Sequence, residues 1–174
     1  MEKQMPVYLD YNASTPVAPE VADAMQPFLR QGFGNPSSRH WASAGLQESL
    51  TEARRQVAGL LGCGPAEIVF TSGGSEATNH ALKGAYFTSG KRAAHIVTTQ
   101  IEHPATSETC RFLERLGAQV TYRPVDGNGL LDPNDFRRAI IRDTILVSVM
   151  HANNEVGTIQ PIAEISRIAH EHHV

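Results

Sequence analysis

The stretch Glu67-Ile-Val-Phe-Thr-Ser-Gly-Gly-Ser-Glu-Ala-Thr-Asn79 joins a short β-branched and aromatic run to a pair of glycines and the start of a helical pattern. The apolar run predicts a β-strand, and Gly73 and Gly74 allow a tight turn directly after it. Downstream, apolar residues recur at helical spacing, namely Ala77, Ala81, Leu82 and Ala85. We therefore expect a strand that passes through the glycines into a helix.

The same junction has the features of an anion-binding site. Ser75 lies in the first helical turn, where its hydroxyl and the free backbone N–H groups converge and the helix dipole favours a negative ligand. A phosphate would fit there. The alternative is an ordinary βα turn with a serine cap, because glycine-rich turns of this kind are common in α/β folds.

Helices and strands alternate along the rest of the chain. The expected helices cover 19–31, 46–61 and 105–116, with two more that begin after Asp132 and at Pro161; the expected strands are His95–Thr99, Gln119–Tyr122 and Thr144–Met150. The alternation predicts an α/β fold with a mostly parallel sheet and helices on both faces. Ligands bind such sheets at the carboxyl ends of the strands. The polar clusters that follow the strands could therefore share one site: Thr71–Glu76, Gln100–His103 and His151–Glu155.

Composition excludes few classes of protein. The 174 residues are 41% hydrophobic and 19% charged, with a net charge of −3, as in ordinary soluble domains. No broad basic surface is expected, so nucleic acid is not an expected partner. The N-terminus lacks an apolar segment of signal-peptide length, and the other apolar runs are strand-sized. We expect a soluble cytoplasmic protein without a membrane partner.

Four polar residues, at three places in the chain, are candidates for ligand contact. His103 follows an expected strand and precedes Pro104, so it could stack on a flat ligand or move a proton, or simply cap a helix. Asn153 and Asn154 follow the apolar run 144–150, where an amide could bind a ring substituent or form a turn. Asn35, beside Pro36, presents the same choice between a turn and ligand contact.

Side chains that form covalent intermediates are scarce. Carbonyl chemistry on an amino acid needs a Schiff-base lysine, and neither the tail residue Lys3 nor Lys83 and Lys91 has a suitable position. Cys63, in a turn, and Cys110, on a helix, are expected to be structural. The histidines of 170–174 fit a solvated helix end better than a metal site, because neighbouring helical residues point in different directions.

Five motifs in register resemble the N-terminal part of a NifS/IscS-type cysteine desulfurase, of the class V aminotransferase family. They are Val7-Tyr-Leu-Asp-Tyr-Asn-Ala-Ser-Thr-Pro16, Phe33-Gly-Asn-Pro-Ser-Ser38, Glu67 to Asn79, Glu102-His103 and Met150-His-Ala-Asn-Asn-Glu-Val-Gly157. The match runs in order over essentially the whole chain. It implies the fold type I large domain, the cofactor pyridoxal 5'-phosphate (PLP) and a homodimer.

The resemblance also implies roles for individual residues. Gly74 and Ser75 match positions that hold the cofactor phosphate, and Ser75 retains the hydroxyl of a position that is often Thr. His103 matches the histidine that stacks on the pyridine ring and assists proton transfer. Asn154 matches the amide near the phenolic oxygen of the ring and the substrate, and Asn35 falls in a loop that approaches the substrate.

Several elements of the family lie beyond these motifs. The resemblance implies that 1–18 form an N-terminal segment and 19–174 the N-terminal part of the large domain. A later Asp for the pyridinium nitrogen, a Schiff-base Lys, a persulfide-forming Cys and the small C-terminal domain have no counterpart in these residues. We therefore expect the chain alone to be inactive.

The leading hypothesis is a fragment of a cysteine desulfurase, which converts L-cysteine to L-alanine and passes the sulfur as a persulfide to a sulfur acceptor or an iron–sulfur scaffold protein. Selenocysteine lyase, which shares these motifs, is the enzymatic alternative. A non-catalytic binding or partner module built on a truncated fold is the alternative from another class.

Overall fold

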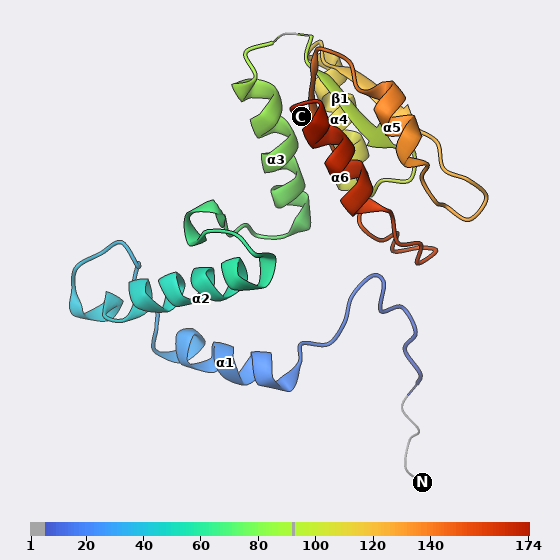
Figure 1. Ribbon diagram of the computed structural model, residues 1–174. Helices are drawn as coiled ribbons and strands as arrows, with labels where there is room; N and C mark the ends of the chain where they lie inside the picture. The colour runs from blue at the N-terminus through green and yellow to red at the C-terminus, as the bar shows by residue number, and fades with distance from the viewer. Residues whose placement is uncertain (1–5, 92) are drawn as a thin grey trace. The chain divides into compact units, whose positions relative to one another are not determined.

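The computed structural model describes residues 6–91 and 93–174, which form two compact units, Met1–Phe70 and Thr71–Val174 (Figure 1). The boundary between the units falls inside the stretch 67–79. The prediction that 19–174 belong to one large domain stays a prediction.

The first unit is helical. Its elements are α1 (Pro19–Arg30), η1 (Trp41–Ser43), α2 (Leu46–Leu61) and η2 (Pro65–Glu67). Pro19 starts α1 at a position where its missing N–H is not needed. Gly62 ends α2 in the left-handed conformation (φ 69°) that glycine adopts without strain. Both predicted helices are confirmed.

The predicted strand before the glycine pair is wrong. Ile68 has extended dihedral angles, yet 68–71 pair with no strand among the described residues. Val69 and Phe70 are 62% and 45% exposed. A strand is stable only when its backbone groups are paired, and apolar β-branched residues indicate a strand only if a sheet can receive them.

The second unit is an α/β layer structure. Its elements in chain order are α3 (Gly74–Thr88), β1 (His95–Thr99), α4 (Pro104–Arg115), β2 (Gln119–Arg123), α5 (Pro133–Ala139), β3 (Thr144–Val147) and α6 (Ile162–Glu171). The three strands are parallel in the order β2-β1-β3. Asp132 caps α5 through the Asn134 N–H (2.9 Å), as its position before Pro133 predicts.

Successive residues of the central strand β1 point to opposite faces of the sheet and pack against different helices. Ile96 packs in a cluster with Leu82 of α3 and Leu113 of α4, whereas Val97 packs with Phe136 of α5 and Ile165 of α6. Figure 1 shows α5 (orange) and α6 (red) on the side of the sheet opposite α4. The prediction of a mostly parallel sheet with helices on both faces is confirmed.

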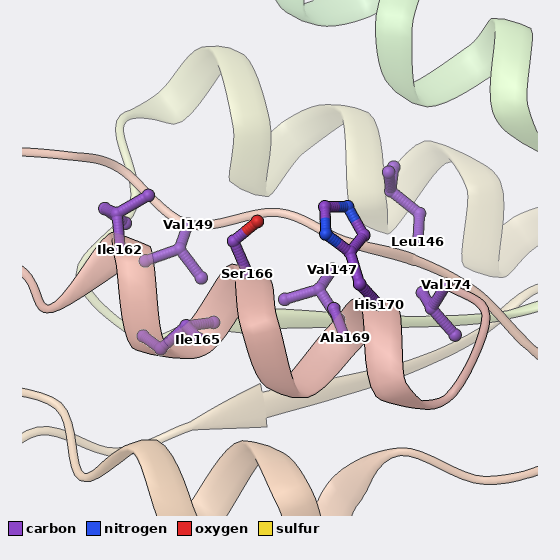
Figure 2. A pocket seen from close by; sticks show the side chains of 9 residues that line it. All are labelled: Leu146, Val147, Val149, Ile162, Ile165, Ser166, Ala169, His170 and Val174. Atoms are coloured by element: carbon purple, nitrogen blue, oxygen red, sulfur yellow. The ribbon is translucent and has the colours of Figure 1, made fainter.

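Strand β3 lies at an edge of the sheet. Its apolar residues Ile145, Leu146 and Val147 are half-buried, so the prediction of a strand buried on both faces is wrong: β3 pairs with β1 on one side only among the described residues. A pocket of about 370 Å³ lies between this edge and α6 (Figure 2). Its lining is mostly apolar, so it is not suited to a phosphate.

His95 at the start of β1 predicts a dependence of stability on pH. Its imidazole is buried between the hydroxyls of Thr144 (Nδ1, 2.7 Å) and Thr121 (Nε2, 2.8 Å). Burial lowers the pKa of His95 below 6.5, so the unfolded chain takes up this proton more readily. The free energy of unfolding should therefore be highest above pH 6.5 and fall as the pH drops through the folded pKa.

Urea denaturation between pH 7.5 and 5.5 measures this effect. His95→Gln removes the titrating group and should flatten the curve over this range. An equal slope in the variant would show that other groups cause the dependence.

Candidate functional site

Helix α3 begins with backbone donors that lack helical acceptors. Gly73 is the N-cap, and the first i→i−4 bond runs from the Ala77 N–H to the Gly73 carbonyl (3.0 Å). The N–H groups of Gly74, Ser75 and Glu76 precede that bond and point out of the helix. A Cβ atom added to Gly73 or Gly74 would meet no atom within 4 Å. The helix terminus is therefore open to an anion.

The chain bends at Ser72 and Gly73, at the expected position before α3. Gly73 has φ 161°, an extended conformation open to any residue, and Gly74 is helical, so the bend does not depend on a conformation that only glycine adopts. What the glycines provide is unobstructed access to the first amides of α3.

The loop before α3 is held by a carboxylate in the first turn. Glu76 Oε2 accepts hydrogen bonds from the Ser72 N–H (2.7 Å) and the Ser72 hydroxyl (2.6 Å). These bonds lower the pKa of Glu76, so the side chain is ionised at neutral pH. Within the described residues the Ser75 hydroxyl makes no hydrogen bond, and it remains free for a ligand.

His103 is the N-cap of α4. Its Nδ1 accepts a hydrogen bond from the Ala105 N–H (3.0 Å), and the ring is exposed. A neutral imidazole whose Nδ1 accepts carries its proton on Nε2. The capping and ligand-contact alternatives therefore coexist: Nδ1 caps the helix while Nε2–H is free to donate to a ligand.

A pocket of about 370 Å³ lies at the carboxyl end of β3, between α3 and α4. This carboxyl-end pocket is lined by Thr78, Ala81, Leu82, Glu102, His103, Thr106 and the run Leu146, Val147, Ser148, Val149 and Met150. Ser75 lies three residues before Thr78, on the same face of α3. The structure thus brings His103 to the pocket and places Ser75 one helical turn from its wall.

Glu102 belongs to the Glu102-His103 motif, but the sequence alone indicated no role for it. Its Oε1 accepts hydrogen bonds from the Thr99 hydroxyl (2.9 Å) and the Met150 N–H (2.9 Å). Burial raises the pKa of Glu102, although both bonds favour the ionised form. A signal was present, because a carboxylate in the short loop after a fully buried strand needs internal partners.

The paired asparagines have different environments. Asn153 is buried; its Oδ1 accepts from the N–H groups of Glu155 (2.9 Å) and Val156 (3.0 Å), and its Nδ2 donates to the Ile101 carbonyl (3.3 Å). Asn154 is exposed, with a long contact from Nδ2 to Glu155 Oε1 (3.4 Å). Asn153 therefore forms the turn, and Asn154 is the amide that remains available to a ligand.

Asn35 belongs to the first unit, and its position relative to the other candidate residues is not defined. Its Oδ1 accepts the Ser37 N–H (2.9 Å), which closes an Asx turn. Its expected contact with substrate stays a prediction.

The described lysines lie away from the carboxyl-end pocket. Lys83 places its ammonium 4.6 Å from the centre of the Phe112 ring, and Lys91 pairs with Asp143 (3.3 Å) at the amino end of β3. Lys3 lies outside the described residues. Cys110 is fully buried, and burial raises the pKa of its thiol to about 11, which agrees with a structural role.

The sequence profile of the family "aminotransferase class-V" matches residues 7–174. The chain belongs to the aminotransferase class-V family. Relatives of the family include cysteine desulfurases named IscS from Dictyoglomus turgidum, 50% identical, and from Methanosarcina thermophila, 48% identical, each over 97% of this chain. A solved structure described as SspA in complex with cysteine is 41% identical, with a TM-score of 0.92 over 96% of this chain.

The match to this aminotransferase class-V group covers part of each relative. The chain spans 43% and 42% of the two cysteine desulfurases and 48% of the SspA chain. The resemblance inferred from the five motifs is thereby confirmed at the level of the family. The family and these desulfurases depend on PLP, and two features of this chain suit that cofactor: open amide donors for a phosphate and an adjoining pocket for a ring.

Proposed function

We propose that this chain is part of a PLP-dependent cysteine desulfurase, which converts L-cysteine to L-alanine and transfers the sulfur as a persulfide. The observation that carries the proposal is the open N-terminus of α3 beside a pocket at the carboxyl end of the sheet, with His103 in its wall. The names of the relatives support cysteine as the substrate.

Each candidate residue has a proposed task. The amides of Gly74 and Ser75 and the Ser75 hydroxyl donate to the phosphate, in the manner of helix N-termini that bind anions. His103 would stack on the ring, and its Nε2–H, which the helix cap leaves free, would donate a hydrogen bond. Asn154 offers its amide to the ring oxygen and the substrate, and Asn35 approaches the substrate. When bound, PLP supplies the electron sink for breaking bonds at the amino-acid Cα and Cβ.

The surroundings of the reaction are also part of the proposal. We propose a homodimer that works in the cytoplasm and delivers sulfur to an acceptor or iron–sulfur scaffold protein. The IscS names of the relatives favour a role in iron–sulfur cluster assembly. None of the helices in 6–91 and 93–174 is long and apolar enough to cross a membrane.

Comparison of PLP with pyridoxal, which lacks the phosphate, tests the cofactor site. We expect equilibrium dialysis of the 174-residue chain to show PLP binding at least about 10-fold tighter, because the phosphate forms charge-assisted hydrogen bonds at α3. Mass spectrometry after borohydride reduction should show no cofactor on Lys83 or Lys91, since neither lines the pocket. Equal affinity for the two compounds would refute the phosphate site, and release of alanine from L-cysteine by this chain would refute the expected inactivity.

A further inference from the structure

Two loops meet at the carboxyl end of the sheet, and each carries a residue proposed to contact the cofactor. One loop joins β1 to α4 and ends at His103; the other follows β3 and carries Asn154. The two loops are far apart in sequence. Their relative position therefore depends on contacts between them rather than on local backbone preferences.

The first link between the loops is the carboxylate of Glu102. A single oxygen, Oε1, accepts from the Met150 N–H on one loop and from the Thr99 hydroxyl at the end of β1. Thr99 is itself 1% exposed, so this end of the link is anchored in the core. The residue next to Glu102 is His103, so the position of the carboxylate constrains the start of α4.

A second link supports the first. Asn153 Nδ2 donates to the Ile101 carbonyl (3.3 Å), one residue before Glu102. The same amide group folds the 150–157 turn through its Oδ1. Two hydrogen bonds therefore cross between the same loops, at Ile101 and at Glu102.

We propose that Glu102 is a positioning residue for the cofactor site, because its carboxylate clamps the His103 loop to the backbone that leads to Asn154. This role rests on the proposed function and adds a residue to it. Glu102 acts through hydrogen bonds to the protein, and these bonds satisfy a carboxylate that is half-buried beside an apolar strand.

Two substitutions separate the hydrogen bonds from the charge. Glu102→Gln keeps an amide oxygen that can accept both bonds, whereas Glu102→Ala leaves the Met150 N–H and the Thr99 hydroxyl without an acceptor. Glu108→Ala is the matched control, because Glu108 is an exposed glutamate of α4 whose ion pair among the described residues is with Arg111.

Amide hydrogen exchange of the 15N-labelled chain, without cofactor, measures the clamp directly. Glu102→Ala should speed exchange at Met150 by about 10-fold or more, as expected for loss of a hydrogen bond to a charged group. Exchange at Ile96, in the centre of the sheet, should be unchanged. Glu102→Gln and Glu108→Ala should exchange at nearly the rate of the parent chain at both positions.

Cofactor affinity gives the second readout. Glu102→Ala should weaken PLP binding by about 10-fold, with recovery in Glu102→Gln. If Glu102→Ala does not fold, Thr99→Val is the variant that tests the clamp, because valine is close to threonine in volume. It removes the Thr99 hydroxyl that donates to Glu102, and should speed exchange at Met150 about 3-fold. An unchanged Met150 amide in these variants would overturn the clamp. If no form of the chain binds PLP but the exchange results hold, only the proposed function fails.

Discussion

Replacement of Ser75 by Asp should reduce the affinity for PLP by about 100-fold or more. The phosphate carries close to two negative charges, and a new carboxylate 4 Å away repels each by about 1 kcal/mol even in bulk water. Loss of the hydroxyl donor weakens the free energy of binding by about 1.5 kcal/mol more. Every 1.4 kcal/mol of binding free energy is a factor of about ten in affinity. Equilibrium dialysis against PLP measures the change.

The folded state should survive this substitution. Aspartate in the first turn of a helix interacts favourably with the helix dipole, by about 0.3–1 kcal/mol, so the melting temperature should hold or rise. Ser75→Thr retains the hydroxyl and should bind PLP with nearly unchanged affinity. Thr88→Asp adds the same charge at the exposed opposite end of α3 and serves as the control. Equal effects of Ser75→Asp and Thr88→Asp would place the phosphate elsewhere.

Replacement of Phe136 by Ala should lower the free energy of unfolding by about 3–5 kcal/mol. Phe136 on α5 is 0% exposed and packs with Val97 of β1, Leu131 and Ile165 of α6. Alanine would leave a cavity in the cluster that packs α5 and α6 against the sheet. Domains of this size are stable by about 5–15 kcal/mol, so the loss would be a large share of the free energy of unfolding.

Urea denaturation followed by circular dichroism measures this loss. Phe87→Ala is the matched control, because Phe87 lies on α3 of the same unit but is 61% exposed. The control should change the free energy of unfolding by less than about 1 kcal/mol. Similar losses in the two variants would mean that the α5–α6 cluster does not stabilise this unit.

Local signals predicted the elements of this fold well. Gly62 after an apolar stripe predicted the end of α2, and Asp132 before Pro133 predicted the start of α5, because caps depend on one or two neighbouring residues. The position of His103 after a buried strand placed it correctly at the carboxyl end of the sheet.

Features that depend on distant partners could not be predicted. Ile68–Phe70 have the composition of a strand, but no described strand pairs with them. Sequence also could not divide the roles of Asn153 and Asn154, because burial of Asn153 depends on Ile101 in another loop. For the same reason the role of Glu102 was missed: its partner Met150 is 48 residues away.

The cap on α4 makes the helix part of any proton transfer by His103. While Nδ1 accepts the Ala105 N–H, the neutral ring carries its single proton on Nε2. Loss of that proton would leave an imidazolate, so the capped ring offers a hydrogen bond from Nε2 and not the proton itself. The helix therefore keeps His103 as a neutral hydrogen-bond donor, and any exchange of protons at this ring requires the cap on α4 to open.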